Sequence, residues 1–273
     1  MMMKLLRIIV AEVTAVTLAV FAVVFFQEKV LTDKTIPVIT VEEGVLEVKS
    51  GASDEELLAG VTAYDEKDGD LTDRVLVESI GKFSEIGYCK VTYAVGDSDH
   101  HVVTAQRQIH YTDYQPPTFY LRRALLFSIY NDVNVIGAVG AKDCLDGDIS
   151  GNVIIYSPDF ETGKEGLYTL QATVQNSKGD TAEIVLPMVV DRLTRNGPQI
   201  NLKEYLIYVK KGTKPDWNSY VTSTADSTGI EAPLTIRTET DYNADKPGTY
   251  TVDYYGTDSL QSVGRTRLIV IVK

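Results

Sequence analysis

The strongest constraint on the fold of this chain is an internal repeat. Three similar stretches each begin with a glycine that a tyrosine follows within two residues: GYCKVTYAV (87–95), GLYTLQATV (166–174) and GTYTVDYYG (248–256). A proline-containing stretch precedes each of them: IPVITV (36–41), PPTFYL (116–121) and GPQINL (197–202). A period of about 80 residues indicates an array of small domains of one kind.

Each repeat has the pattern of a β-domain. In the first repeat Cys89, Val91 and Tyr93 alternate with polar residues, and a period of two is typical of a strand with one buried face. Polar turns separate such strands, and little helical periodicity is present. We therefore expect a mostly-β chain of three tandem antiparallel β-sandwiches, with domains at 36–113, 114–192 and 197–273.

Residues 1–29 are predicted to be a cytoplasmic stub followed by one transmembrane helix. Residues 8–26, IIVAEVTAVTLAVFAVVFF, carry a single charge at Glu12, and a helix of this length spans about 30 Å of hydrocarbon. Two basic residues precede the segment and favour an N-terminus inside the cell, which leaves 30–273 outside. A cleaved signal peptide, which would make the protein secreted, and a buried helix of a cytosolic protein are the alternatives. The apolar run is longer than a usual signal core, and no small-x-small cleavage pattern follows it.

The balance of charged residues excludes one class of partner. The formal net charge is −12, and an acidic surface repels the phosphate backbone of nucleic acids. The two cysteines, Cys89 and Cys144, fall in different repeats, so neither repeat carries a disulfide of its own. We expect the partners to be the membrane, through residues 8–26, and an unidentified extracellular protein or glycan.

Two of the repeats share the acidic motif D-x-x-D-G-D. It lies in YDEKDGDLTD (64–73) and in KDCLDGDIS (142–150), whereas the third repeat has STADSTGIEAP (223–233) at this place and lacks it. The candidate metal ligands in the two motifs are Asp65, Asp68, Asp70, Asp73, Asp143, Asp146 and Asp148.

Three interpretations of this motif are open. As a turn, its aspartates accept hydrogen bonds from nearby backbone amides and its glycine takes a positive φ. As a calcium site, the same oxygens supply several of the six to eight ligands that calcium needs, although the spacing is not that of an EF-hand loop. As paired catalytic carboxylates, they would need a cleft, which a repeated turn does not supply. We expect a turn, no enzymatic activity, and no cofactor unless calcium binds here.

The motif, followed by G-x-Y-x-[VL] and a D-S or N-S turn, resembles a bacterial immunoglobulin-like domain of the type first described in an insecticidal crystal protein. The residues that carry the resemblance are Asp65 to Asp70, Gly87 and Asp97-Ser98 in the first repeat, Asp143 to Asp148, Gly166 and Asn176-Ser177 in the second, and Gly248, Tyr250 and Asp258-Ser259 in the third. The resemblance covers about 36–273. It implies spacers, adhesive modules or companions of catalytic domains in extracellular proteins, and a fold of this kind does not fix an activity.

Several other residues have a functional and a structural interpretation. The pair His100-His101, among aspartates, is either a zinc pair or a hairpin turn, and His110 has no evident partner in the sequence. We expect Cys89 in the core, Cys144 exposed, and Trp217 in the core or at a domain edge rather than as a ligand platform.

The function that these observations favour is a non-catalytic, membrane-anchored protein at a bacterial cell surface. It would act as a structural spacer or a protein-interaction module. The alternative is an adhesin for a carbohydrate or a host ligand, with exposed aromatic residues clustered on one domain around Trp217 and Tyr220.

Overall fold

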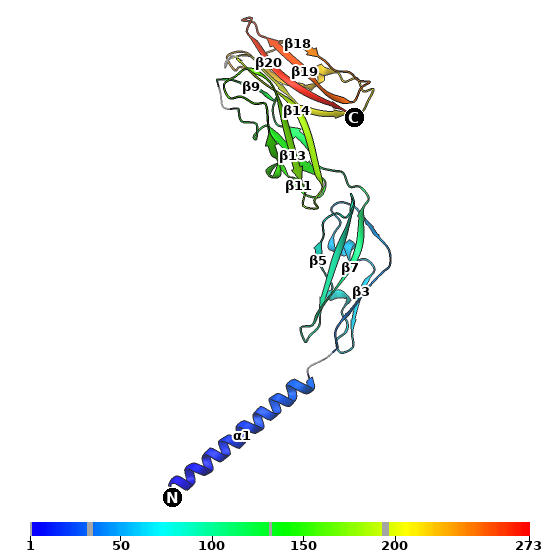
Figure 1. The fold of residues 1–273 in the computed structure, drawn as a ribbon, viewed down its shortest axis with the longest axis vertical. Coiled ribbons are helices and arrows are strands. Elements are labelled where there is room, and N and C mark those ends of the chain that lie inside the picture. Colours follow the sequence, from blue (N-terminus) through cyan, green and yellow to red (C-terminus); the bar gives the residue numbers. More distant parts are fainter. Residues whose placement is uncertain (1, 32–34, 131–132, 193–196) are drawn as a thin grey trace. The chain divides into compact units, whose positions relative to one another are not determined.

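The computed structural model describes residues 2–31, 35–130, 133–192 and 197–273 (Figure 1). The chain divides into two compact units, Met1–Thr112 and Asp113–Lys273. We call the three stretches predicted as domains segment 1 (36–113), segment 2 (114–192) and segment 3 (197–273). The boundary between segments 1 and 2 lies within two residues of the boundary between the units. Segments 2 and 3 share one unit, so their separation into two domains stays a prediction.

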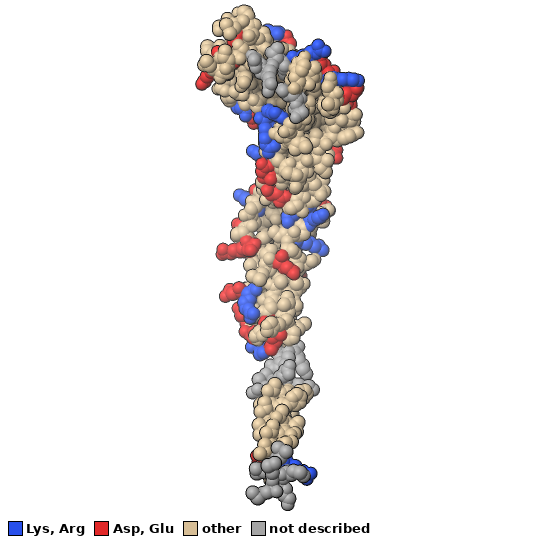
Figure 2. All heavy atoms as spheres, turned by 90° about the vertical axis from the view of Figure 1, so that its left-hand side faces the viewer, with Lys and Arg blue, Asp and Glu red and all other residues tan. Residues whose placement is uncertain are grey.

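The N-terminal element is one long helix, α1 (Met2–Leu31). Its part from Arg7 to Phe26 is long and apolar enough to cross a membrane, and none of it is buried against the rest of the described structure. Thr14 and Thr17 donate their hydroxyl hydrogens to the carbonyls of Val10 and Val13, so their polar groups are satisfied within the helix. In Figure 2 the described part of the helix shows few charged side chains, whereas the β-segments carry charges of both signs on the face shown.

Segment 1 consists of two sheets. The smaller sheet has the order β1-β3-β4 and the larger has the order β2-β7-β6-β5. Its strands and helical turns are β1 (Val38–Val41), β2 (Leu46–Val48), α2 (Asp54–Leu57), β3 (Val61–Asp65), β4 (Gly69–Asp70), η1 (Thr72–Arg74), β5 (Leu76–Ile80), β6 (Tyr88–Gly96) and β7 (Val102–Tyr111). The alternation expected for β6 is confirmed, because Cys89, Val91 and Tyr93 are all buried.

Segment 2 repeats this arrangement, with one sheet of the order β11-β10-β8 and one of the order β12-β13-β14-β9. Its elements are β8 (Thr118–Leu121), β9 (Leu126–Ser128), β10 (Val139–Asp143), β11 (Gly147–Asp148), η2 (Ser150–Asn152), β12 (Ile154–Tyr156), β13 (Gly166–Gln175) and β14 (Thr181–Asp191). The core between the two sheets is built by residues such as Phe119, Leu170, Leu186 and Met188.

Segment 3 has a two-stranded sheet, β15-β17, and a four-stranded sheet, β16-β20-β19-β18. Its elements are β15 (Gln199–Leu202), β16 (Leu206–Val209), η3 (Trp217–Tyr220), β17 (Val221–Ala225), β18 (Thr235–Thr240), β19 (Gly248–Thr257) and β20 (Val263–Val272). Ile200, Val252, Tyr254 and Leu268 form the centre of its core. The fold is therefore mostly β, built as sandwich-like domains behind one N-terminal apolar helix, as the sequence predicts.

The sheets are antiparallel with one exception that recurs in each segment. The second strand of the segment pairs in parallel with the last strand: β2 with β7, β9 with β14, and β16 with β20. The chain therefore leaves the smaller sheet after its first strand and joins the edge of the larger sheet. This crossing closes one side of the sandwich. The predicted antiparallel pairing therefore holds for the strand pairs of the described structure except this parallel one in each segment.

A buried tyrosine ties a short helical turn to the core in segments 1 and 3. The hydroxyl of Tyr93 on β6 donates to the carbonyl of Leu57 at 2.8 Å, and that of Tyr254 on β19 donates to the carbonyl of Trp217 at 2.9 Å. Both tyrosine side chains are fully buried. Each bond therefore satisfies a backbone carbonyl and fixes the helical turn over the core.

Segments 2 and 3 also pack on each other within their common unit. Leu206 and Ile269 of segment 3 belong to the buried cluster that centres on segment 2. The hydroxyl of Tyr208 donates to the carbonyl of Phe119 at 3.2 Å. An apolar contact with a directed hydrogen bond restricts the motion of one segment against the other.

We expect the substitution Tyr93→Phe to lower the free energy of unfolding of segment 1 by about 1–3 kcal/mol, because it leaves the carbonyl of Leu57 without its buried partner. Urea denaturation of the full chain in detergent measures this difference. Tyr64→Phe is the matched control, since Tyr64 is 60% exposed. An equal effect of the two substitutions would contradict a structural role for the buried bond.

Candidate functional site

The acidic motif of segment 1 is a hydrogen-bonded turn at the end of β3. One oxygen of Asp65 accepts hydrogen bonds from the backbone amides of Lys67 at 2.8 Å and Asp68 at 3.0 Å. Asp70 accepts from the amide of Thr72 at 2.9 Å, where η1 begins. The first aspartate of the motif thus shapes the turn, and the last one satisfies an amide at the start of a helical turn.

The motif of segment 2 has the same local structure. Asp143, at the end of β10, accepts from the amides of Leu145 at 2.8 Å and Asp146 at 3.0 Å. Asp148 accepts from the amide of Ser150 at 2.9 Å. The glycines between these aspartates have positive φ angles, 77° at Gly69 and 72° at Gly147, which a residue with a side chain adopts only with strain.

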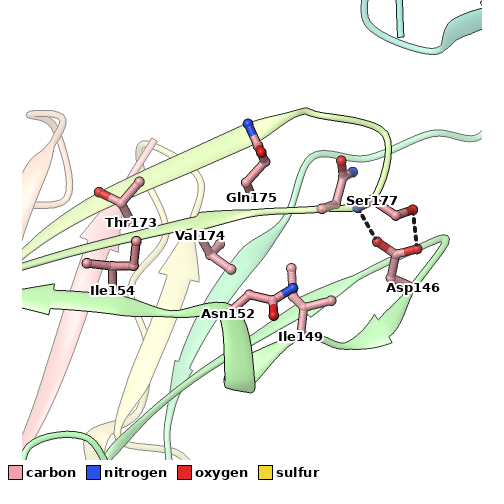
Figure 3. Close-up of a pocket in the computed structure, with 9 residues that line it drawn as sticks. Asp146, Ile149, Asn152, Ile154, Thr173, Val174, Gln175 and Ser177 are labelled. Atoms are coloured by element: carbon pink, nitrogen blue, oxygen red, sulfur yellow. Dashed lines mark hydrogen bonds between the residues drawn. The ribbon is translucent and has the colours of Figure 1, made fainter. Parts of the chain in front are cut away.

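The middle aspartate of each motif forms hydrogen bonds with a second loop, the hairpin between the last two strands of its segment. The two oxygens of Asp68 accept hydrogen bonds from the amide of Ser98 at 2.6 Å and from its hydroxyl at 2.8 Å. Asp146 accepts from the amide and hydroxyl of Ser177 at 2.6 and 2.7 Å, and Figure 3 shows both bonds. We call this contact between the acidic turn and the following hairpin the loop latch.

Segment 3 has a loop latch of opposite polarity. Here the serine lies in the turn and the aspartate lies in the hairpin: the amide and hydroxyl of Ser227 donate to one oxygen of Asp258 at 3.1 and 2.7 Å. The segment that lost the D-G-D motif therefore keeps the contact through exchanged partners. All three segments therefore share a contact between a serine and an aspartate at this place.

The hairpin side of each loop latch begins with a buried aspartate or asparagine. Asp97, Asn176 and Asp258 are 4–6% exposed. Each accepts a hydrogen bond from the amide four residues later, at 2.8, 2.9 and 2.8 Å respectively. These side chains hold the hairpin in the conformation that presents it to the acidic turn.

The hydrogen bonds of the loop latch favour the ionised carboxylates. The amide and hydroxyl of Ser98 lower the pKa of Asp68 below its ordinary value, and the hydroxyl and amide of Ser227 do the same for Asp258. The hydroxyl and amide of Thr72 lower the pKa of Asp70. The lowered pKa values keep Asp68, Asp70 and Asp258 ionised at neutral pH, where they already accept hydrogen bonds from the protein.

The calcium hypothesis concerned Asp65, Asp68, Asp70, Asp73, Asp143, Asp146 and Asp148. Within the described ranges, no group of three or more His, Cys, Asp or Glu side chains converges as a metal site. Asp73 lies in η1 with an exposed side chain, away from the turn that Asp65 shapes. Calcium would have to displace the serine donors of the loop latch, and its binding stays a prediction.

An open groove lies beside the loop latch of segment 2 (Figure 3). Its volume is about 530 Å³. Asp146 and Ser177 border it at one end, and Ile154 on β12 and Thr173 on β13 border it further along. The groove contains mixed apolar and amide side chains and no arrangement of acid and base that would suggest catalysis.

The other candidate residues have structural contacts. His100 has a positive φ of 70°, and the ring of His101 lies 2.6 Å from a carboxylate oxygen of Asp97, so the pair is part of a hairpin turn. His110 does have a partner: its ring nitrogen lies 2.7 Å from Glu47 on β2. As expected, Cys89 is buried and Cys144 is exposed.

Three aromatic residues of segment 3, Trp217, Tyr242 and Tyr250, are partly buried and packed on its core. Trp217 meets Tyr242 edge to face with ring centres 5.1 Å apart, and Tyr242 meets Tyr250 in the same way at 5.7 Å. Trp217 is therefore a domain-edge residue, as the sequence favours. One side of this cluster borders a groove of about 570 Å³ that Lys214, Asp241 and Asn243 also line.

Comparisons with known proteins give two partial similarities in sequence. No family model matches the chain. It is 32% identical over 139 residues to an uncharacterized 81.3 kDa protein of Acholeplasma phage L2, covering 48% of this chain and 18% of that protein. It is 32% identical over 131 residues to the pesticidal crystal protein Cry22Aa of Bacillus thuringiensis, covering 44% and 17%. The chain thus spans less than a fifth of either relative, and the similarity to a crystal protein expected from the motifs is confirmed.

Solved structures give only weak overall likeness. Drosophila N-cadherin EC1-3 matches 89% of this chain and 90% of that chain at 13% identity with a TM-score of 0.32. ZmpB of Clostridium perfringens, a structure of its M60 catalytic domain with two CBM51 domains, matches 88% and 31% at 15% identity with a TM-score of 0.23. Scores this low carry no inference about the function of this chain.

We expect the loop latch to make the protein less stable in acid. A carboxylate whose pKa is lowered by folding stabilises the folded state above its ordinary value of 3.8, and this contribution is lost as the pH falls through the lower folded value. Asp68→Asn should therefore reduce the melting temperature at neutral pH and flatten its decline between neutral pH and about pH 2.5. Asp73→Asn, three residues after the motif and outside the loop latch, should leave the profile as in the wild type.

The calcium hypothesis has its own test. A ligand that binds only the folded state at a hundred times its dissociation constant stabilises it by about 2.7 kcal/mol, which a thermal melt detects. If the motif binds calcium, melts of the full chain should rise with calcium relative to EDTA, and the doubly substituted variant D68N/D70N should lose the rise that comes from segment 1. Identical melts with calcium and with EDTA would leave the motif as a turn.

Proposed function

We propose that this chain is a non-catalytic, membrane-anchored extracellular protein that acts as a structural spacer or protein-interaction module at a bacterial cell surface. In this proposal the β-region consists of three tandem immunoglobulin-like domains, and α1 is the single membrane span. The observation that carries the proposal is the exposed apolar part of α1, Arg7 to Phe26, which has no core to cover it in the described structure.

The chemistry of the β-segments supports a role without catalysis. Apart from Asp73, the carboxylates that the sequence marked as candidates accept hydrogen bonds from amides and hydroxyls of the same protein, so they serve to hold loops together. The grooves are open and combine apolar with amide and hydroxyl groups. Such surfaces suit recognition of another molecule more than the positioning of an acid and a base.

The orientation follows from the charges around the helix. Lys4 and Arg7 precede the apolar span, and positive residues tend to stay on the inner side of a membrane. Residues 30–273 then lie outside the cell.

We expect removal of residues 1–31 to move the protein from the membrane fraction to the soluble fraction of the cells that express it. On intact cells bearing the full chain, an added protease should digest segments 1 to 3. The intact mass of the membrane-bound protein separates anchor from signal, because a cleaved signal peptide leaves a shorter chain. Recovery of the full-length chain in the soluble fraction would contradict the anchor.

The alternative function is an adhesin for a carbohydrate or a host ligand. Its specific support is the groove beside Trp217 and Tyr242, where aromatic rings adjoin the polar side chains of Lys214, Asp241 and Asn243. Its volume of about 570 Å³ falls in the range of small-molecule sites. Binding of soluble glycans to the full chain, lost in Trp217→Ala but kept in Tyr130→Ala, would favour this alternative.

A further inference from the structure

A groove lies between segments 2 and 3, which belong to one compact unit. We call it the intersegment groove. Its volume is about 440 Å³, and binding sites for small ligands often have such a size and lie where two domains meet. Segment 2 contributes Leu167, Thr169 and Pro187 to its walls, and segment 3 contributes Thr249 and Arg267. Both segments are therefore needed to form this groove.

The two walls of the intersegment groove are held together by contacts outside it. Leu206 and Ile269 of segment 3 are buried in the cluster that centres on segment 2. A guanidinium nitrogen of Arg265 on β20 lies 3.4 Å from a carboxylate oxygen of Asp191 on β14. The groove is therefore formed before any ligand arrives, and a ligand does not have to bring the two segments together.

The intersegment groove meets the groove beside Trp217 at Asp241, because this residue lines both. One carboxylate oxygen of Asp241, Oδ1, accepts a hydrogen bond from the amide of Thr251 at 2.7 Å. The other oxygen, Oδ2, accepts none from the residues that the structure describes. The two grooves therefore share a carboxylate oxygen that is available to a ligand.

The floor of the intersegment groove offers side chains rather than backbone groups. The strands β13, β14, β19 and β20 each have a hydrogen-bonded strand on both sides, so an extended peptide finds no free strand edge here. The polar groups at the groove include the hydroxyls of Thr169, Thr249 and Thr251. A hydroxyl can donate one hydrogen bond and accept two, which matches the hydroxyls of a sugar.

The charges at the two grooves favour a neutral ligand. Arg267 is 7% exposed and donates to both carboxylate oxygens of Asp253 at 2.8 Å, so its charge is already neutralised. Lys214 and Asp245, which line the groove beside Trp217, carry opposite charges. The chain as a whole carries −12 and repels anionic ligands.

We infer that the two grooves together bind a neutral oligosaccharide of several sugar units. The rings of Trp217 and Tyr242 contact the apolar face of one sugar, and Asp241 accepts hydrogen bonds from the hydroxyls of the next. The following sugars contact Leu167 and the threonine hydroxyls of the intersegment groove. This assignment rests on the alternative function given above, a carbohydrate adhesin, and adds a second groove and a class of ligand to it.

The first test is the dependence of affinity on the length of the glycan. Isothermal titration calorimetry of the full chain, in a detergent without a sugar headgroup, measures the dissociation constants of cellohexaose, maltohexaose and N-acetylchitohexaose and of their disaccharides. At least one hexasaccharide should bind about tenfold or more tightly than its disaccharide, because one chain occupies both grooves. A protein that binds none of the hexasaccharides, or that binds unfolded peptides of a casein digest in their place, would overturn the inference.

The second test separates the intersegment groove from the groove beside Trp217. Leu167→Ser and Thr249→Val should each raise the dissociation constant of the hexasaccharide about fivefold or more and leave that of the disaccharide unchanged. Leu76→Ser and Thr235→Val are the matched controls, since Leu76 on β5 is 67% exposed and Thr235 on β18 is exposed, and neither lines the two grooves. Thermal melts of all four variants should match the wild type. Equal losses in variants and controls would contradict a role for the intersegment groove.

The outcomes distinguish this inference from the functions proposed above. Suppose that the Trp217→Ala variant loses the disaccharide, while hexasaccharide binding is unchanged by L167S and T249V. The adhesin then stands and the intersegment groove is overturned as part of its site. Absence of all glycan binding would overturn both. The membrane anchor is tested by fractionation and depends on neither result.

Discussion

A carboxylate that accepts two hydrogen bonds from one serine closes each sandwich at the end where the acidic turn meets the hairpin. The contact joins residues about 30 positions apart in the chain, as in Asp68 with Ser98. The ion pair of Lys67 with Asp99 joins the same two loops in segment 1, and the hydrogen bond from Asn176 to Asp143 does so in segment 2. Neither Cys89 nor Cys144 forms a disulfide, so no disulfide performs this task. The exchanged partners of segment 3, Ser227 and Asp258, show that the fold keeps the contact while the motif changes.

Much of this fold follows from the sequence because its signals are periodic and local. The alternation in 87–95 fixes which side chains of β6 enter the core, and the repeat of about 80 residues places equivalent strands in each segment. The turn at Asp65 is local too, since its bonds reach only two and three residues ahead. A motif whose hydrogen bonds close within itself can be interpreted from a single sequence.

The features that the sequence did not predict depend on contacts between distant residues. His110 pairs with Glu47, 63 positions earlier, because β2 joins the larger sheet in parallel beside β7. Nothing in the local pattern of β2 distinguishes this parallel pairing from an antiparallel one. The same holds for the loop latch: Ser98 and Ser177 resemble any turn serine until the fold brings them to Asp68 and Asp146.

The three segments differ at their sheet edges, whereas each of them has a loop latch. A contact that every segment needs for closure is preserved even when its partners exchange, so it carries no information about what the protein binds. An edge strand is under a different constraint, because its unpaired backbone groups can pair with another chain unless the edge is protected or covered. Segments 1 and 3 meet this constraint with a bulge and with charges, and segment 2 meets it with an edge strand of three residues, β12, that Pro158 and Asp159 follow.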